Sequence, residues 1–231
     1  MRVLALDAAT EACSVALLSG DETIGRFAVG IPSAAPHLLA MVEAVLAESG
    51  MALTMLDGIA ASIGPGAFTG VRISVATAQG LAFGAGLQVV PVMTLEALAC
   101  RAMRSGVQHA LACLDARMGE VYWGCFAADL KRGVRALSTA RVGPPQSVEL
   151  AGAGLYGGIG RGFAAYPQLG ELPGLVLEPG DAQALPHARE FARLGAIRLG
   201  LGEGLDPAGL TPLYLRDKVA LTEAERRLST R

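Results

Sequence analysis

An internal repeat is the feature of this sequence that most limits what the chain can fold into. Residues 4–18 read LALDAATEACSVALL, and residues 111–126 read LACLDARMGEVYWGCF. Each copy has an apolar strand that ends in Asp-Ala, a short turn with a glutamate, and a second apolar strand. The copies begin nearly half of the 231-residue chain apart. We therefore expect one unit duplicated into two lobes, an N-terminal lobe of residues 1–104 and a smaller, more degenerate C-terminal lobe of residues 105–231.

The pattern around the first copy alternates strands and helices. Short apolar runs bounded by turn residues predict strands, and apolar residues at three- and four-residue spacing predict helices. The expected strands are Val3–Leu6, Cys13–Leu18, Ile24–Val29 and residues 56–64. The expected helices cover residues 33–50, with Ser33 as N-cap and Gly50 at the end, and a segment from about Val71. This order predicts an α/β layer architecture with mixed sheets flanked by helices.

Composition indicates a cytoplasmic globular protein. Hydrophobic residues make up 52% of the chain and charged residues 17%, with a net charge of −2, so the basic footprint of an RNA-binding surface is missing. Asp7 interrupts the N-terminal apolar run, which argues against a signal peptide. The uncharged stretch from Ile73 to Leu95 contains glycines, a proline and polar residues, so we expect helix, turn and strand there rather than a membrane span. The four cysteines form no C-x-x-C pair, and they fit a reducing cytoplasm.

The stretch GPGAFTGVRISVATAQGLAFG, residues 64–84, raises the question of phosphate binding. A Walker loop needs a lysine directly after its last glycine, whereas Gly70 is followed by Val71. We therefore favour the interpretation that the glycines let the backbone turn tightly between a strand and a helix. A helix N-terminus still favours an anion nearby, so phosphate binding stays the alternative.

The turn after Asp7 bears on the same question. ATP-binding proteins of the actin, heat-shock and sugar-kinase fold carry an acid at the end of this strand, and the turn that follows contains glycine. Here the turn reads DAAT, with Ala8 and Ala9 in it. Each methyl group crowds the space that a phosphate would occupy. We favour the interpretation of Asp7 as a turn-forming acid that accepts hydrogen bonds from nearby amides.

Signatures of other chemistries are weak or missing. GAGLYG, residues 152–157, matches the dinucleotide-binding pattern, but no long amphipathic helix follows it. His37, His109 and His187 are far apart in sequence, and the chain contains neither an H-E-x-x-H nor a G-x-S-x-G motif. We therefore expect no catalytic residue, no metal ion and no cofactor.

Two predicted helices, residues 37–48 and 72–83, are apolar or small on almost every side. A helix of that kind is covered on more than one side. Small residues on the second side would let another helix approach closely. Burial within one chain and docking of a partner explain this pattern equally well.

Four stretches together resemble the TsaB family, formerly called YeaZ: LALDAATEACSVALL, GPGAFTGVRISVATAQGLAFG, LDARMGEVYW and PLYLR. The resemblance implies a duplicated actin-like, ribonuclease H-like (ASKHA) fold of two lobes. It also implies a non-catalytic subunit that binds the catalytic paralogue TsaD, with the small ATPase TsaE, for threonylcarbamoylation of adenosine 37 in tRNAs that read codons beginning with A. The paralogue holds its metal with an H-x-x-x-H helix, whereas His37 is followed four residues later by Met41 here.

The resemblance places the partner interface on the two helices of the first lobe. The residues expected there are Leu39, Glu43, Leu46, Arg72, Ile73, Thr77, Ala78 and Leu81. Contacts with a nucleotide or a subunit are expected, more weakly, from Asp7, Thr10, Gly64, Gly66, Thr69, Arg117 and Glu120. We also expect that the isolated chain can form a homodimer and that tRNA is reached only through the complex. The alternatives are a small-molecule kinase or ATPase of the same fold and, less favoured, a peptidase.

Overall fold

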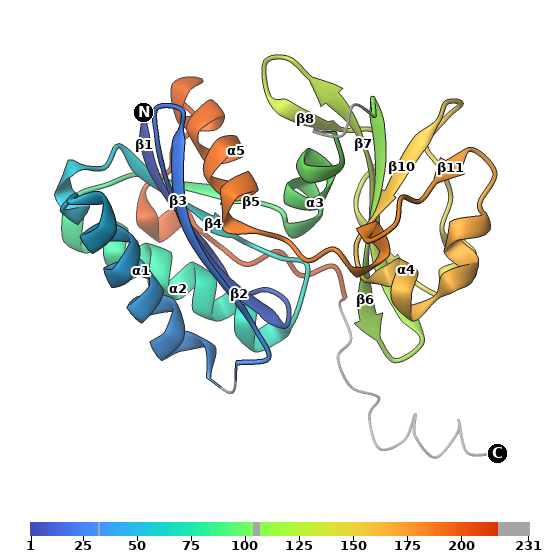
Figure 1. Cartoon of the computed structure of the whole chain (residues 1–231), viewed down its shortest axis with the longest axis horizontal. Helices are drawn as coiled ribbons and strands as arrows, with labels where there is room; N and C mark the ends of the chain where they lie inside the picture. Colours follow the sequence, from blue (N-terminus) through green and yellow to red (C-terminus); the bar gives the residue numbers. More distant parts are fainter. Residues whose placement is uncertain (32, 104–106, 217–231) are drawn as a thin grey trace.

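The computed structural model describes residues 1–31, 33–103 and 107–216. They form two lobes, each built on one β-sheet (Figure 1). The first sheet contains β1 (Arg2–Asp7), β2 (Ala12–Ser19), β3 (Glu22–Val29), β4 (Gly58–Ser62) and β5 (Val89–Val92). The second contains β6 (His109–Arg117), β7 (Glu120–Asp129), β8 (Gly133–Ala136), β9 (Arg141–Gly143), β10 (Tyr156–Ile159) and β11 (Leu175–Val176).

The two sheets have the same topology. Their strand orders are β3-β2-β1-β4-β5 and β8-β7-β6-β10-β11, while β9 pairs with β7 off this path. In each sheet the central strand, β1 or β6, pairs antiparallel with the strand that follows it in sequence. On its other side it pairs in parallel with β4 or β10. The duplicated actin-like fold that the sequence predicts is therefore confirmed.

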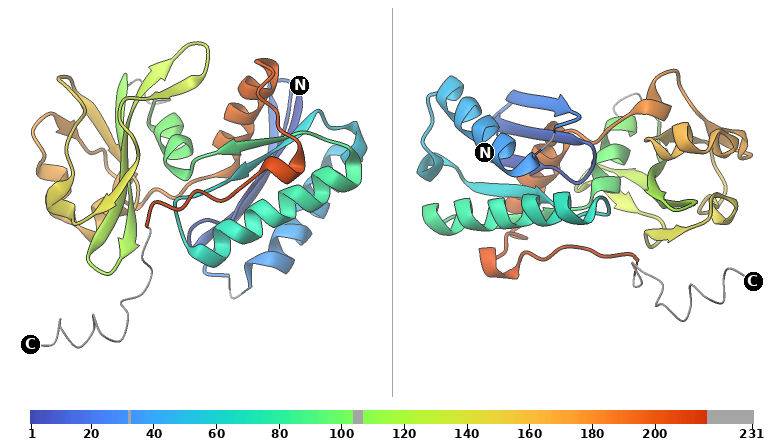
Figure 2. Two further views of the ribbon diagram at one scale, coloured as in Figure 1. Left: turned by 180° about the vertical axis from the view of Figure 1, so that it is seen from behind. Right: turned by 90° about the horizontal axis from the view of Figure 1, so that it is seen from below.

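Helices cover both faces of the first sheet. The α-helices of the two lobes together are α1 (Ala34–Ser49), α2 (Phe68–Ala85), α3 (Thr94–Met103), α4 (Gly162–Ala165) and α5 (Ala188–Gly200), of which α1, α2 and α5 cover the first sheet. Because side chains alternate across a strand, Leu4 and Leu6 pack with Val42 of α1 on one face. Val3 and Ala5 point the other way into the core that contains α5. Figure 2 shows α1 and α2 side by side, with α5 across the sheet from them.

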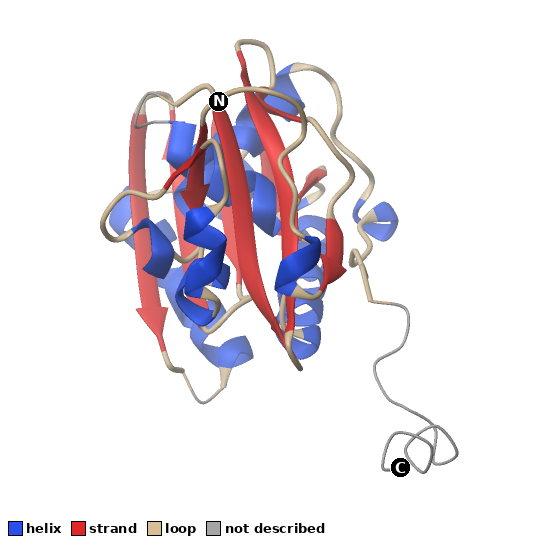
Figure 3. Ribbon diagram, turned by 90° about the vertical axis from the view of Figure 1, so that its right-hand side faces the viewer, coloured by secondary structure: helices blue, strands red, loops and turns tan. Residues whose placement is uncertain are grey.

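The helices do not follow the expected division at residue 104. Helix α5 comes from the second half of the sequence but packs on β1, β2 and β4 of the first sheet. Helix α3 comes from the first half and packs on β6, β7 and β10 of the second sheet. Figure 3, viewed from the side of the second lobe, shows the strands running side by side with helices around them. The boundary between residues 104 and 105 lies outside the described residues, and the division stays a prediction.

The expected ends of α1 are confirmed, with Ser33 before it and Gly50 after it, and the expected start of α2 is corrected. Ser33 occupies the N-cap position of α1, but its side chain makes no capping hydrogen bond. Helix α2 begins at Phe68 rather than near Val71. The amide of Val71 already donates to the carbonyl of Ala67 over 3.0 Å, because Gly70, the last glycine of the glycine turn (residues 64–70), lies inside the first helical turn. Arg72 therefore lies in the second turn of α2.

The two lobes are joined by a mostly buried ion pair between α3 and α5. Nη2 of Arg198 lies 2.7 Å from Oε1 of Glu96. Nη1 of the same arginine donates to the carbonyl of Pro91 over 2.7 Å. Glu96 also accepts from the amide of Met93 at the start of α3. Since these groups come from both lobes and few water molecules reach them, the pair fixes how the helices meet.

The described chain ends in a segment that runs along the first lobe and reaches the second, which we call the strap (residues 205–216; Figure 2). Leu205 forms an antiparallel bridge with Val89. The amide of Leu213 donates to the carbonyl of Ile63 over 2.7 Å. Arg216 then donates to the carbonyl of Ala116 in the second lobe over 3.1 Å. None of the helices in the described part of the chain has the length and apolar character needed to cross a membrane.

Candidate functional site

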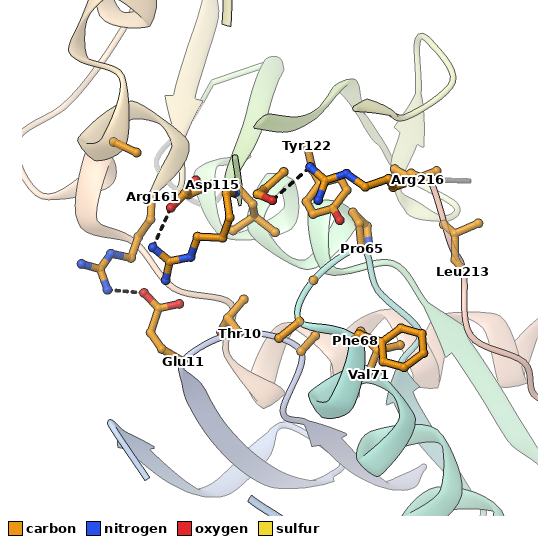
Figure 4. A pocket seen from close by; sticks show the side chains of 18 of the residues that line it. Thr10, Glu11, Pro65, Phe68, Val71, Asp115, Tyr122, Arg161, Leu213 and Arg216 are labelled. Atoms are coloured by element: carbon orange, nitrogen blue, oxygen red, sulfur yellow. Dashed lines mark hydrogen bonds and ion pairs between the residues drawn. The ribbon is translucent and has the colours of Figure 1, made fainter. Parts of the chain in front are cut away.

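A cavity of about 690 Å³ lies between the two lobes (Figure 4). Its wall combines the turns of both sequence repeats with the glycine turn, the start of α4 and the strap. The side chains in its wall include Thr10, Glu11, Phe68, Asp115, Arg117, Tyr122, Arg161, Tyr214 and Arg216. The volume is within the range of small-molecule sites in proteins. The repeats thus meet at one place, which is where a ligand between the lobes would be held.

The glycine turn packs directly against the turn that follows β1. A Cβ on Gly66 would lie 2.0 Å from the carbonyl oxygen of Ala9, and one on Gly70 would lie 1.9 Å from that of Ala8. The amide of Ala67 donates to the carbonyl of Ala9 over 2.7 Å. These glycines are required because two backbones touch, which is a more specific reason than the tight turn that we expected. Protein atoms therefore fill the space in front of Ala8, whereas Ala9 and Thr10 lie in the wall of the cavity.

Asp7 is buried and does not line the cavity. Its Oδ1 accepts a hydrogen bond from the amide of Ala9 over 3.0 Å, as expected for a turn-forming acid. Its Oδ2 has no hydrogen-bond partner among the described residues. Burial raises the pKa of Asp7 to about 6. A carboxyl group without solvent access cannot touch a ligand in the cavity, so the expected contact of Asp7 with a nucleotide or subunit is wrong.

Each arginine that lines the cavity is paired with a carboxylate. Arg161 pairs with Glu11 across the lobes, and Figure 4 shows this pair at one side of the cavity. Nη1 of Arg117 lies 2.9 Å from Oδ2 of Asp115 in its own hairpin. Arg216 pairs with Glu120, a partner that the sequence could not supply, because the residues are far apart along the chain.

These ion pairs neutralise the arginine side chains that would otherwise attract a phosphate group. The other residues from which we expected contacts with a nucleotide or a subunit lie at different distances from the cavity. Thr10, Gly66 and Arg117 line it, and Glu120 adjoins it through Arg216. Gly64 is buried against Val71, and Thr69 is exposed on the first turn of α2. Whether any of them contacts a nucleotide or a subunit stays a prediction.

The residues expected at the partner interface differ in exposure. Leu39, Glu43 and Arg72 are exposed, whereas Leu46, Ile73, Thr77 and Leu81 are half-buried. Ala78 is fully buried in the core between the sheet and the helices. The assignment of Ala78 to a docking surface is therefore wrong, because its side of α2 faces the sheet of its own lobe.

Helix α2 also exposes residues that the sequence did not predict at its surface. Ala76, Gly80 and Phe83 are exposed, and the side chain of Phe83 is 84% accessible. They follow Arg72 at intervals of four, four and three residues, which is the spacing of one helix face. Small side chains surround this helix, so the sequence did not show which of its faces points outward. We call Leu39, Glu43, Ala76, Gly80 and Phe83 the outer helix face.

The three histidines are dispersed. His37 is exposed on α1. His109 stacks on Tyr156 at a ring-centroid distance of 5.1 Å, and His187 stacks on Phe27 at 5.0 Å. Within the described ranges, no three histidine, cysteine or acidic side chains gather as metal ligands would.

Comparisons with known proteins agree on one family. The family model described as TsaD: tRNA N6-adenosine threonylcarbamoyltransferase matches residues 34–140. The tRNA threonylcarbamoyladenosine biosynthesis proteins TsaB of Escherichia coli K12 and Haemophilus influenzae are 39% and 34% identical to this chain. The E. coli alignment covers 95% of this chain and 96% of its relative, and the H. influenzae alignment covers 95% of each.

A solved structure of YeaZ from Pseudomonas aeruginosa is 39% identical, with a TM-score of 0.84, and the match covers 93% of this chain and 99% of that one. A second structure, described as an uncharacterized protein from the same organism with similarity to peptidase YeaZ, is 40% identical with the same TM-score and coverage. These matches extend over nearly the whole chain, both lobes included. The chain therefore belongs to the TsaB (YeaZ) family of tRNA threonylcarbamoyladenosine biosynthesis proteins.

Proposed function

We propose that this chain is a non-catalytic subunit in the synthesis of threonylcarbamoyladenosine in tRNA. In this proposal it binds the catalytic paralogue TsaD, together with the ATPase TsaE, in the cytoplasm. The complex modifies adenosine 37 of tRNAs that read codons beginning with A, and tRNA contacts this chain only through the complex. The names of the relatives support the pathway, and the cavity between the lobes supports the non-catalytic role.

One observation carries the non-catalytic role. The turn that would hold ATP phosphates in an actin-like protein carries methyl groups here and is packed against the backbone of Gly66 and Gly70. A phosphate group that approached Ala8 would have to displace the start of α2. The arginines of the cavity are also already neutralised by Glu11, Asp115 and Glu120. The backbone contact at Ala8 and the pairing of these arginines therefore both argue against a site for the phosphates of ATP at this turn.

The outer helix face is the surface that we assign to the paralogue. Its side chains lie on α1 and α2, which cover the sheet face opposite α5 (Figure 2). Ala76 and Gly80 are small, so a partner helix could approach the backbone of α2 closely. Leu39 on α1 and Phe83 on α2 add large exposed apolar side chains. The same surface could pair two copies of the chain when the paralogue is absent.

Substitution of Ala76 tests this surface. Ala76→Glu places a charge on the outer helix face, and Ala136→Glu places one at an exposed position on β8 of the second lobe. Each variant is co-expressed with the TsaD protein of the same organism and analysed by size-exclusion chromatography. We expect Ala76→Glu to lose the complex and Ala136→Glu to keep it, with both variants folded by circular dichroism. Full recovery of the complex with Ala76→Glu would show that the paralogue binds elsewhere.

Calorimetry with Mg-ATP separates this proposal from a kinase or ATPase of the same fold. We expect no binding to the isolated chain at millimolar nucleotide, because the phosphate position is filled. Micromolar binding would restore the kinase alternative. Proteolysis of a broad peptide panel by the isolated chain would in turn restore the peptidase alternative.

A further inference from the structure

Helix α5 has an outward face that carries two unpaired arginines. Arg189 and Arg193 are exposed and lie one helical turn apart. Gly195, on the opposite side of the helix, packs on β4, where an added Cβ would lie 2.5 Å from the Cβ of Ala60. Most other arginines in the described part of the chain pair with a carboxylate. Among the described residues, the guanidinium groups of Arg189 and Arg193 have no such partner.

A third unpaired cation lies at the tip of the β7–β8 hairpin. Lys131 is exposed there, and its ammonium group forms no ion pair with any described residue. The hairpin packs on the second half of α5, because a Cβ on Gly133 would lie 3.3 Å from Cδ1 of Ile197. Arg132, next to the lysine, pairs with Glu203 just beyond the end of α5. The tip of the second lobe therefore extends the positive charge of this helix.

An exposed aromatic stack adjoins the first of these arginines. The ring of Phe27 on β3 stacks on that of His187, the residue before α5, with centroids 5.0 Å apart and planes 5° from parallel. Phe27 remains 41% exposed. Gly25 lies two residues before it on the same side of β3, and a Cβ there would lie 3.7 Å from Nε of Arg189. A flat ring and a guanidinium group thus lie beside each other on one surface.

Acidic side chains near this surface are turned away or already bound. Because side chains alternate along a strand, β3 turns Phe27 toward α5 and Glu22 to the side where Arg26 pairs with α1. On α5 itself, Glu190 is buried. Asp129, in the hairpin turn, accepts hydrogen bonds from two backbone amides. We call Phe27, Lys131, Arg189 and Arg193 the basic face.

We propose that the basic face binds the phosphate backbone of tRNA once the complex with TsaD has formed. This inference rests on the proposed function and deepens it. Helix α5 lies across the first sheet from α1 and α2, so a partner on the outer helix face leaves the basic face open (Figure 1). Lysine and arginine bind phosphate groups, and RNA-binding surfaces add aromatic rings on which bases stack. The exposed ring favours RNA over an acidic protein as the occupant.

The number of cations explains why the contact needs the complex. Each phosphate that a protein neutralises adds about 0.7–0.9 to the dependence of log affinity on log salt concentration. Three cations therefore give a weak contact, and the net charge of the chain is −2. The partner has to supply the rest of the affinity, so the contact is measured on the complex of this chain with TsaD.

Paired substitution of Arg189 and Arg193 by glutamine tests the charged part. The complex is titrated with a fluorescently labelled tRNA that reads a codon beginning with A, at several NaCl concentrations. Loss of two phosphate contacts should lower the salt dependence by about 1.4–1.8 and raise the dissociation constant at about 100 mM NaCl at least tenfold. The control is Arg2→Gln with Arg141→Gln, which changes the net charge equally but removes arginines that are already paired. It should change the dissociation constant less than about twofold.

Substitution of Phe27 tests the aromatic part. Threonine suits a strand, so Phe27→Thr should remove the ring and keep β3. Val29→Thr is the matched control, because Val29 is 52% exposed on the same side of the same strand. We expect Phe27→Thr to raise the dissociation constant about fivefold without changing its salt dependence, since base stacking is not a charge contact. Val29→Thr should leave it within about twofold, and thermal melting checks that both chains fold.

The outcomes separate this inference from the proposed function. If the wild-type chain forms no complex with TsaD, or the complex does not bind tRNA, both are overturned. If the wild-type complex binds tRNA and the arginine and phenylalanine variants bind it with the same affinity and salt dependence, only the assignment of the basic face is overturned. Titration with TsaE covers an acidic protein: loss of TsaE binding with unchanged tRNA binding in the arginine variant would assign the basic face to that protein and overturn the assignment to RNA.

Discussion

Substitution of Gly70 by alanine tests the contact between the glycine turn and the turn after β1. The new Cβ would lie 1.9 Å from the carbonyl oxygen of Ala8, whereas ordinary contacts begin near 3.4 Å. The two turns must therefore move apart. That movement strains the 2.7 Å hydrogen bond from Ala67 to Ala9 and the 2.8 Å bond from the amide of Ala8 to Oγ of Ser74.

The size of the effect follows from three contributions. Overpacking of a core costs about 1–3 kcal/mol, and losing one of the two hydrogen bonds costs about 1 kcal/mol more. Alanine returns about 1 kcal/mol through its higher helix propensity. We therefore expect Gly70→Ala to lower the free energy of unfolding by about 2 kcal/mol.

Gly80→Ala in the same helix is the control. No atom lies within 4 Å of the Cβ that it would add, and Gly80 is exposed. Only helix propensity acts there, so this variant should gain about 0.5–1 kcal/mol. Urea unfolding with equal m values measures both changes. A Gly70→Ala chain as stable as Gly80→Ala would refute the argument that the two backbones touch.

Two further predictions concern the free energy of unfolding. Arg198→Met should lower the free energy of unfolding by about 2–3 kcal/mol, because Glu96 and the carbonyl of Pro91 lose a mostly buried charged donor. The control Arg132→Met breaks an exposed pair with Glu203 and should lower it by less than about 1 kcal/mol. Equal losses of stability in the two variants would contradict the role given to the buried pair. The pKa of Asp7 rises from 3.8 to about 6 on folding, so the folded chain binds this proton more tightly than the unfolded chain does. The free energy of unfolding of the wild type should therefore fall, relative to that of Asp7→Asn, as the pH rises from about 4 to about 6. The difference between the two chains should grow by about 2–3 kcal/mol and then stay level above pH 6; a difference independent of pH would mean that Asp7 is not desolvated.

The repeat made the fold predictable from the sequence. Two copies of a strand, an Asp-Ala turn and a second strand predict two central hairpins, and β1–β2 and β6–β7 are those hairpins. The crossing of α3 and α5 between the lobes was not predictable. A helix pattern in the sequence shows which residues are buried, but it does not show against which sheet they pack.

The candidate site was predictable only in part. The residue types in GPGAFTG and DAAT argued against phosphate binding. The contact between these two turns could not be predicted, because it depends on the pairing of β1 with β4, which brings the turns together. The outward direction of Ala76 and the burial of Ala78 are set by the rotation of α2 on the sheet. The small side chains all around this helix gave no apolar stripe from which to read that rotation. The partners of Arg161 and Arg216 lie in other lobes or segments, so no local pattern signals them.

Reconstitution of the tRNA modification tests the central claim most directly. The TsaD and TsaE proteins of the same organism are incubated with tRNA, threonine, bicarbonate, ATP and an enzyme that supplies the activated threonylcarbamoyl group, with or without this chain. Threonylcarbamoyladenosine is then quantified by mass spectrometry of the digested tRNA. We predict modification only when this chain accompanies TsaD, and none when this chain replaces TsaD. Modified tRNA in the reaction without TsaD, or equal yields with and without this chain, would contradict the account.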